Sequence, residues 1–228
     1  MSRMLEVKNL SIELERNLVL ENLSFGVEPG ETLVILGPNG AGKTVLLKTL
    51  LGLLPHKGTI EWRKGIKIGY VPQSLPVIKD IPMSVQDFFE LENISEEETK
   101  EILKSVGIEE DALEKGINQF SSGQFQRILI GWALIGNPDV LLFDEPTTGI
   151  DIGGEETIYN LLEKLKDEKG LTMILVSHDL SVVYKFAANV LCLNKKLICT
   201  GLPKEVLTKE TLGQLYGSEI KIYKHEHE

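Results

Sequence analysis

The sequence predicts an α/β fold with a parallel sheet, and two observations carry that prediction. First, the apolar run TLVIL (32–36) leads directly into GPNGAGKT (37–44), which opens a stretch of helical character, TVLLKTLLGLL (44–54). Second, two further apolar runs, DVLLF (139–143) and TMILV (172–176), flank the helical segment GEETIYNLLEKLKDEKG. A strand–helix–strand order brings successive strands into one sheet in the same direction, so these runs predict parallel strands.

Other strands are predicted by alternation and turn signals. Apolar and polar residues alternate in strand-like fashion between residues 5 and 27, and the turn Pro29-Gly30 closes this segment. After the helical stretch that follows residue 44, GTIEW (58–62) and KIGYV (67–71) predict two short strands.

The middle of the chain predicts helices. From about Met83 to Asn137 the spacing of apolar residues becomes helical. Ser84 and Ser95 are suited to cap helices, and Ser95 with Glu98 has the spacing of a capping box. We therefore expect a helical insertion between the early strands and the run at 139–143.

Residues 37–44 have the composition of a loop that binds a phosphate chain, in the pattern G-x-x-x-x-G-K-[ST]. Glycines let backbone N–H groups converge on the phosphates without side chains in the way, and the following helix adds positive potential. Lys43 is suited to reach the β- and γ-phosphates, and the Thr44 hydroxyl to bind Mg²⁺. The sequence therefore predicts a nucleoside triphosphate site formed by Gly37, Pro38, Asn39, Gly40, Ala41, Gly42, Lys43 and Thr44.

Composition excludes several other classes of protein. The 228 residues are 42% hydrophobic, which is enough for a full core, and the net charge of −10 argues against sequence-independent binding to nucleic acid. The first residues lack the apolar region of a signal peptide, and the longest apolar run, ILIGWALI (128–135), is far shorter than the ~20 residues that span a bilayer. We expect a soluble chain that reaches a membrane only through a partner.

Further polar residues follow the predicted strands. Asp144 and Glu145 end the run at 139–143, where Asp144 is suited to hold Mg²⁺ through its waters and Glu145 to polarise an attacking water. Gln73 follows the strand KIGYV, and His178 follows TMILV, where it is suited to donate to a γ-phosphate. Gln73 or His178 alone would predict nothing.

The motifs GPNGAGKT, YVPQ, FSSGQFQR, LLFDEPTTGID and VSHDL, in this order and spacing, resemble the ATP-binding cassette (ABC) family over at least residues 5–217. The resemblance implies a P-loop NTPase of ABC type, with a RecA-like core, an antiparallel β-subdomain and an inserted helical subdomain. We expect one nucleotide-binding domain over 1–228, with the core and β-subdomain in 1–75 and 136–228 and the helical subdomain in 76–135.

The resemblance also implies an activity and residue roles. It implies ATP hydrolysis with Mg²⁺ in a dimer that sandwiches two nucleotides. Lys43 and Glu145 would act in catalysis, with Glu145 as general base, and Gln73 and His178 would sense the γ-phosphate. Thr44, Gln73 and Asp144 would bind the metal ion.

The segment FSSGQ (120–124) resembles the family's LSGGQ signature. It implies that a helix N-terminus formed by Ser121, Ser122, Gly123 and Gln124 contacts the γ-phosphate held by a second copy of the chain, and Ser121 is a good N-cap. Asp151 matches the family aspartate that couples the two sites of the dimer.

Three positions depart from the family pattern. Phe120 replaces the usual leucine, and Ser122 replaces a glycine, which adds a β-carbon that restricts the backbone. Leu14 stands where the family usually has an aromatic residue that stacks on adenine, and no aromatic residue precedes Phe25. We therefore expect that recognition of the base is either weak or made by other residues.

Within the family, the chain resembles the ATPase subunits of zinc and manganese importers. The stretches SHDLSVVYKFAANVLCLN and GLPKEVLT and the ending LYG carry this resemblance, which iron-chelate importers partly share. It implies a membrane permease, a second copy of the chain, an indirect link to a substrate-binding protein, and a place on the cytoplasmic face of the membrane. The alternatives are a soluble ABC ATPase of the iron–sulfur-assembly type and an importer of another solute, such as an iron chelate.

Two smaller features concern cysteine and histidine. Cys192 and Cys199 lie in an apolar β-like segment, so they either face each other across a hairpin or are two buried reduced thiols; we expect the thiols. The tail residues His225 and His227 either bind a divalent ion or have no role.

Overall fold

A computed structural model describes residues 3–73, 75, 81–147, 149–150 and 152–217. The chain divides into two compact units, which are described separately. One unit comprises Leu5–Val27, Leu33–Glu61 and Ser177–Glu228, and we call it the P-loop unit because it contains residues 37–44. The other comprises Met1–Met4, Glu28–Thr32 and Trp62–Val176, and we call it the helix-rich unit.

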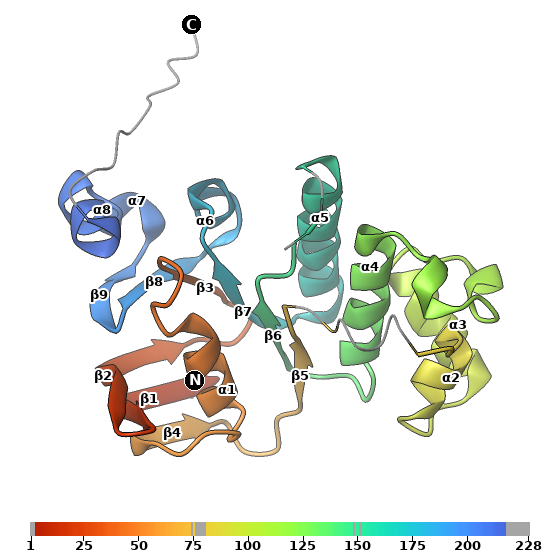
Figure 1. Cartoon of the computed structure of the whole chain (residues 1–228), viewed down its shortest axis with the longest axis horizontal. Coiled ribbons are helices and arrows are strands. Elements are labelled where there is room, and N and C mark those ends of the chain that lie inside the picture. Colours follow the sequence, from red (N-terminus) through yellow and green to blue (C-terminus); the bar gives the residue numbers. More distant parts are fainter. Residues whose placement is uncertain (1–2, 74, 76–80, 148, 151, 218–228) are drawn as a thin grey trace, which may run out of the picture. The chain divides into compact units, whose positions relative to one another are not determined.

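The P-loop unit contains a mixed sheet in the order β4-β1-β2-β9-β8-β3. Strands β1 and β2 form an antiparallel hairpin, as do β8 and β9, whereas β2 runs parallel to β9 and β3 parallel to β8. Figure 1 shows β1, β2 and β4 side by side near the amino terminus. The strands are β1 Leu5–Leu14, β2 Asn17–Val27, β3 Thr32–Leu36, β4 Lys57–Trp62, β8 Asn189–Asn194 and β9 Lys196–Gly201.

Burial explains why these segments form strands. The alternating residues Leu10 and Ile12 of β1 are fully buried, as are Leu20 and Leu23 of β2, while their neighbours face outward. All of β3 is buried, which is typical of a central parallel strand. Each buried aliphatic side chain contributes ~1.5–3 kcal/mol of transfer free energy, so alternation alone specifies which face points inward.

Within its described residues, the P-loop unit also contains the helices α1 Lys43–Leu50, α6 Leu180–Phe186, α7 Pro203–Val206 and α8 Lys209–Tyr216. Helix α1 begins where residues 37–44 predict it, and it ends earlier than the apolar stretch 44–54, because Gly52 has a positive φ of 74°. The side-chain amide of Asn194, Nδ2, donates a hydrogen bond to the backbone carbonyl oxygen of Leu215 at 3.0 Å. This bond connects α8 to the end of β8.

The helix-rich unit contains a parallel sheet of β5 Ile68–Val71, β6 Val140–Asp144 and β7 Thr172–Ser177, in the order β7-β6-β5. Every residue of β6 and β7 is buried. Because both faces of these strands are covered, their sequences are nearly continuous apolar runs. Helix α5, Ile152–Lys169, connects β6 to β7. This confirms the strand–helix–strand prediction and the parallel direction.

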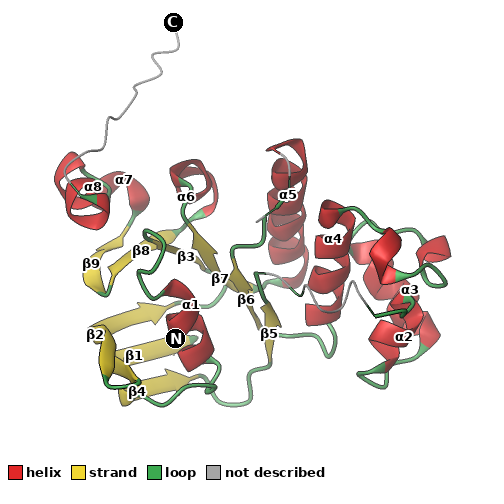
Figure 2. Cartoon of the chain, viewed as in Figure 1, coloured by secondary structure: helices red, strands yellow, loops and turns green. Residues whose placement is uncertain are grey.

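Between β5 and β6 the described residues form helices and loops, with one isolated antiparallel bridge between Ser84 and Gly116 (Figure 2). Ser84 and Ser95 cap α2 and α3 as predicted, and Ser95 Oγ accepts the backbone N–H of Glu98 at 3.2 Å. Phe88 of α2 stacks on Trp132 of α4 with ring centroids 5.6 Å apart. The elements are α2 Val85–Glu90, α3 Glu96–Ser105, the 3₁₀ turns η2 Glu110–Ala112 and η3 Ile117–Gln119, and α4 Ser122–Ala133. A separate subdomain over 76–135 stays a prediction.

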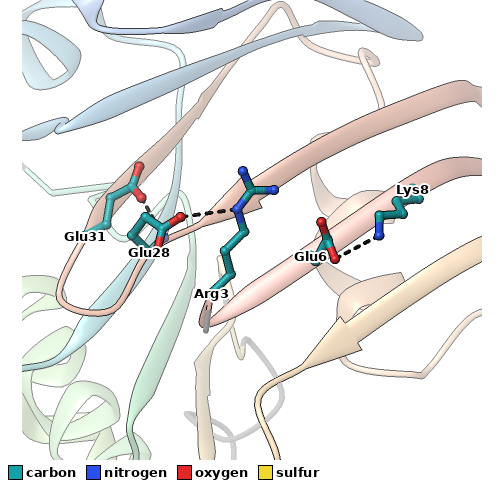
Figure 3. A network of polar contacts seen from close by, with 5 residues as sticks. All are labelled: Arg3, Glu6, Lys8, Glu28 and Glu31. Atoms are coloured by element: carbon teal, nitrogen blue, oxygen red, sulfur yellow. Dashed lines mark hydrogen bonds and ion pairs between the residues drawn. The ribbon is translucent and has the colours of Figure 1, made fainter. Parts of the chain in front are cut away.

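The predicted turn at Pro29-Gly30 is present, and Gly30 has a φ of 74°. Glu31, which is buried, accepts the backbone N–H of Glu28 at 2.7 Å, and the side chain of Glu28 pairs with Arg3 at 3.2 Å (Figure 3). In the P-loop unit, Figure 3 also shows the ion pair of Lys8 with Glu6 on β1. Both ion pairs are exposed and contribute at most ~1 kcal/mol each.

The two cysteines form a disulfide bond, so the expectation of two reduced thiols is wrong. Cys192 and Cys199 are directly opposite each other in the β8–β9 ladder, with Cα atoms 4.9 Å apart, which is within the range that a disulfide spans. Cys192 is fully buried and Cys199 only partly. The apolar pattern predicted the strands, but Cys192 and Cys199 are partners because the register of the ladder shifts by one residue between Cys192 and Leu193.

Within the described residues, no helix is both long enough and apolar enough to cross a lipid bilayer.

Candidate functional site

Lys43 is fastened to the loop that precedes it. Its Nζ donates hydrogen bonds to the carbonyl oxygens of Gly37, at 2.8 Å, and Pro38, at 3.1 Å, and the residue is only 6% exposed. A buried ammonium group needs such acceptors because removing it from water is costly. The loop therefore holds a positive charge in a fixed position at the start of α1, as binding of a phosphate chain requires.

Two glycines of the loop have identifiable reasons to be glycine. Gly42 caps α1 with a φ of 98°, a conformation that other residues rarely adopt, and a β-carbon there would lie 2.6 Å from Leu20 Cδ2. A β-carbon on Gly37 would lie 2.1 Å from the carbonyl oxygen of Leu193 on β8. Residues of β2 and β8 thus pack so closely against the loop that these two positions have no room for a side chain.

The β8–β9 hairpin also holds the loop through its backbone. The N–H of Lys195, in the turn of the hairpin, donates to the carbonyl oxygen of Ala41 at 3.0 Å. Sequence reasoning missed this role of Leu193 and Lys195, since contacts made by backbone atoms leave no signal in residue type.

In the helix-rich unit, parallel pairing brings a glutamine and a glutamate together. Val71 of β5 pairs with Phe143 of β6, so residues 73 and 145 follow the two strands at matching positions. Gln73 Nε2 donates to Glu145 Oε2 at 3.0 Å. The structure thereby joins two side chains that the sequence places 72 residues apart.

The two carboxylates that end β6 have different surroundings. Asp144 is the last residue of the strand and is 2% exposed, whereas Glu145 is partly exposed and has a φ of 50°. A positive φ in a residue other than glycine costs ~1–3 kcal/mol and turns the chain sharply after the strand. The two neighbouring carboxylates therefore differ in burial and in backbone conformation.

Tyr70 on β5 lies near Asp144. Burial, followed by the negative charge of Asp144, raises the pKa of Tyr70 to about 12, so its hydroxyl stays protonated at neutral pH. The motif YVPQ begins with Tyr70, but no role was predicted for this residue. Only the pairing of β5 with β6 brings it to this edge of the sheet.

The predicted N-cap at the signature is present. Ser121 Oγ accepts the N–H of Gln124 at 3.2 Å, and the Gln124 side chain accepts the N–H of Ser121 at 3.1 Å, which is a capping box. Ser122 begins α4 and is absent from the residues with positive φ, so its β-carbon causes no strain in the described structure. The serine at position 122 therefore restricts the backbone without forcing it into a strained conformation.

A cavity of about 450 Å³ lies over the start of α4. The N-terminal turns of α4 and α5 and the loop before α5 supply its walls, and a helix N-terminus favours negative charge. Its lining residues are Ser121, Ser122, Gly123, Gln124, Arg127, Gly149, Ile150, Gly154 and Thr157.

The remaining predicted residues lie in the following places. Leu14 ends β1 and is partly exposed, opposite Asn17 across the β1–β2 turn. His178 is exposed between β7 and α6. Asp151 and the tail residues His225 and His227 lie outside the described residues. Among the residues that are described, no three His, Cys, Asp or Glu side chains gather into a metal site.

A sequence profile of the ABC transporter family matches residues 20–148 of the chain. The chain belongs to the ABC transporter family. The zinc import ATP-binding protein ZnuC of Jannaschia sp. is 40% identical over 217 residues, which cover 94% of this chain and 89% of that protein. The ZnuC protein of Photorhabdus laumondii is 36% identical over 234 residues, covering 100% of this chain and 91% of the relative.

Solved structures agree with this assignment. The cbiO1 protein of Clostridium perfringens, part of the ABC transporter complex cbiONQ, is 28% identical with a TM-score of 0.80, and the match covers 94% of each chain. An ATP-binding cassette of an ABC transporter in its ADP conformation has the same fold, with a TM-score of 0.83 at 23% identity, covering 96% of this chain and all of that one.

Family membership determines the activity of the chain. It is an ABC ATPase with an α/β P-loop fold. It binds ATP, and its ATP hydrolysis is coupled to transport. The fold class and the activity predicted from the sequence are thereby confirmed.

Proposed function

We propose that the chain is the ATPase subunit of an importer for a divalent metal ion, with zinc as the first candidate. The observation that carries this proposal is the similarity to zinc import ATP-binding proteins, at 35–40% identity over 94–100% of the chain. That similarity extends through the β8–β9 hairpin and α7–α8, where the importer-like stretches of the sequence lie.

In this proposal the loop at 37–44 binds the triphosphate of ATP. The buried ammonium of Lys43 supports this role, because phosphate oxygens can replace the loop carbonyls that it now contacts. Mg²⁺ would be held by the Thr44 hydroxyl, the Asp144 carboxylate and the amide oxygen of Gln73. These are the hard oxygen donors that Mg²⁺ prefers, and when bound the ion neutralises charge that develops on the phosphates.

Glu145 is the general base that takes a proton from the attacking water. The hydrogen bond from Gln73 engages one oxygen of its carboxylate and supports a fixed orientation for the other. Gln73 and His178 also sense the γ-phosphate, and Lys43 stabilises charge on the transferred group.

Two copies of the chain form a dimer with two composite ATP sites. The cavity over α4 supports this proposal, since the helix N-terminus formed by Ser121, Ser122, Gly123 and Gln124 favours an anion supplied by the partner copy. Asp151 couples the two sites. A permease binds the dimer at the cytoplasmic face of the membrane, and a substrate-binding protein delivers the ion to that permease.

Base recognition is weak in this proposal. Leu14 offers an apolar contact without a π-face, and stacking on an aromatic ring contributes ~1–3 kcal/mol per base in single-stranded nucleic-acid complexes. ATP and GTP should therefore bind with similar affinity, and Leu14→Tyr should favour ATP. Equal nucleotide preference before and after that substitution would contradict a role for position 14.

The decisive experiment is transport by vesicles that contain the chain and its permease. ATP-dependent uptake of Zn²⁺, measured with a fluorescent zinc indicator and competed by Mn²⁺ or an iron chelate in separate arms, identifies the solute. Preferred uptake of another solute would reject zinc and leave the ATPase in place. Glu145→Gln vesicles should show no uptake, which serves as the control for coupling.

A further inference from the structure

The disulfide between Cys192 and Cys199 lies in the β8–β9 hairpin, which is next to the loop at 37–44 within the P-loop unit. β8 pairs with β3 in parallel register, with Cys192 opposite Leu36, the residue that precedes Gly37. The next residue of β8, Leu193, presents the carbonyl oxygen that would lie 2.1 Å from a β-carbon on Gly37. The cross-link is therefore one residue away from the backbone that shapes the start of the loop.

The turn that the disulfide closes makes two further backbone contacts. The N–H of Lys195 donates to the carbonyl oxygen of Ala41 in the loop, and the carbonyl oxygen of Lys195 accepts the N–H of Glu21 on β2, both at 3.0 Å. Lys195 has a φ of 59°, so its conformation depends on these contacts. Lys196 then forms an ion pair with Glu21 at 2.7 Å.

We propose that Cys192 and Cys199 form a reversible thiol–disulfide site that sets the affinity of the phosphate-binding loop for ATP. The oxidised pair ties β8 to β9, which keeps the carbonyl of Leu193 close against Gly37 and the N–H of Lys195 bonded to Ala41. The reduced pair leaves the same turn closed by hydrogen bonds alone. A loop that is already held in its binding conformation loses less conformational entropy when ATP binds.

The chemistry needs a partner disulfide, and a small-molecule disulfide such as glutathione disulfide supplies it. Cys199 is the more accessible residue, so its thiolate attacks one sulfur of the small disulfide, which forms a mixed disulfide and releases one small thiol. The Cys192 thiolate then attacks the Cys199 sulfur and releases the second thiol. Two protein thiols are oxidised, two small thiols are formed and take up the two protons, and excess thiol reverses both steps.

The experiment compares the full chain in two redox states. Protein equilibrated with glutathione disulfide and protein reduced with dithiothreitol are assigned by alkylation and mass spectrometry, and ATP affinity is measured by competition with a fluorescent nucleotide. The reduced protein should bind ATP about three- to tenfold more weakly, which corresponds to ordering one or two extra groups on binding. Equal affinity in the two states would overturn the proposal.

Cys199→Ser provides the matched control, because it removes the cross-link at the partly exposed position. It should bind ATP like the reduced protein and should not respond to glutathione disulfide; Cys192→Ala should behave in the same way if Cys199→Ser fails to fold. A redox response of equal size in these variants would show that the effect arises elsewhere. Two free thiols in the wild-type chain after exposure to glutathione disulfide would also overturn the proposal.

Hydrogen exchange locates the effect. Reduction should speed exchange of the Lys195 amide, which is bonded to Ala41, while amides of β6 in the helix-rich unit serve as an internal reference and stay unchanged. Faster exchange in both units would indicate general destabilisation and would contradict a local role for the hairpin.

Discussion

The glycine-rich loop at 37–44 and the carboxylate edge of β6 are held in different ways. The loop is shaped by backbone contacts from β8, with Lys43 buried and bonded to two carbonyl oxygens. At the carboxylate edge, Glu145 is partly exposed, has a positive φ, and is held by the side chain of Gln73. The loop proposed to bind ATP is thus positioned by the backbone, whereas the groups proposed for chemistry depend on side chains that a substitution can change without disturbing the fold.

Glu145→Gln should give the largest effect on the carboxylate edge. The amide has the same shape but cannot accept a proton, so the rate of hydrolysis should fall by about 10²–10⁴-fold while ATP binding stays intact. Phosphate release and nucleotide affinity are measured on the same preparation. Glu163→Gln, at an exposed position of α5, is the control, and wild-type turnover in Glu145→Gln would remove Glu145 from the role of base.

Lys43→Ala should give the largest effect on the loop, and the effect should be on binding. Loss of a charged donor costs ~1.5–3 kcal/mol, so ATP affinity at low salt should fall by about 10- to 100-fold. Isothermal titration calorimetry measures this loss directly. Lys48→Ala removes an exposed lysine from the same helix and should bind normally; unchanged affinity in Lys43→Ala would contradict the assignment of the loop.

Gly37→Ala tests whether the backbone of β8 shapes the loop. Its β-carbon would lie 2.1 Å from the Leu193 carbonyl oxygen, so the hairpin must shift, and overpacking of this kind lowers the free energy of unfolding by ~1–3 kcal/mol. Gly153→Ala in α5 has open space around it and should be neutral or stabilising. Urea titrations without nucleotide compare the two, and equal stability would show that the loop tolerates movement of β8.

Gln73→Ala should have the smallest effect of these substitutions, and it tests whether Gln73 acts on the rate through Glu145. If Gln73 acts through Glu145, the substitution should lower the single-turnover rate by roughly tenfold, since residues in contact couple by ~0.5–3 kcal/mol. The same substitution in the Glu145→Gln background should then cost nothing further. Additive losses would mean that Gln73 acts on phosphate or metal independently of the base, and Gln73→Asn tests whether a shorter amide restores part of the rate.

The sequence by itself predicted the elements that depend on local pattern. Alternation identified β1 and β2 because one face of each is buried, and continuous apolar runs identified β3, β6 and β7 because both faces are buried. Ser84, Ser95 and Ser121 were recognised as helix caps because the bond that each makes lies within a few residues. The order of the motifs was enough to identify the family.

Contacts between distant segments could not be predicted from the sequence. The bond from Gln73 to Glu145 depends on the parallel register of β5 and β6, and the disulfide depends on the antiparallel register of β8 and β9. The support of Gly37 and Ala41 by β8 and its turn is made by backbone atoms. Residue types report local propensity and burial, but pairing register and backbone contacts follow from how whole strands align, and no single residue in the sequence records that alignment.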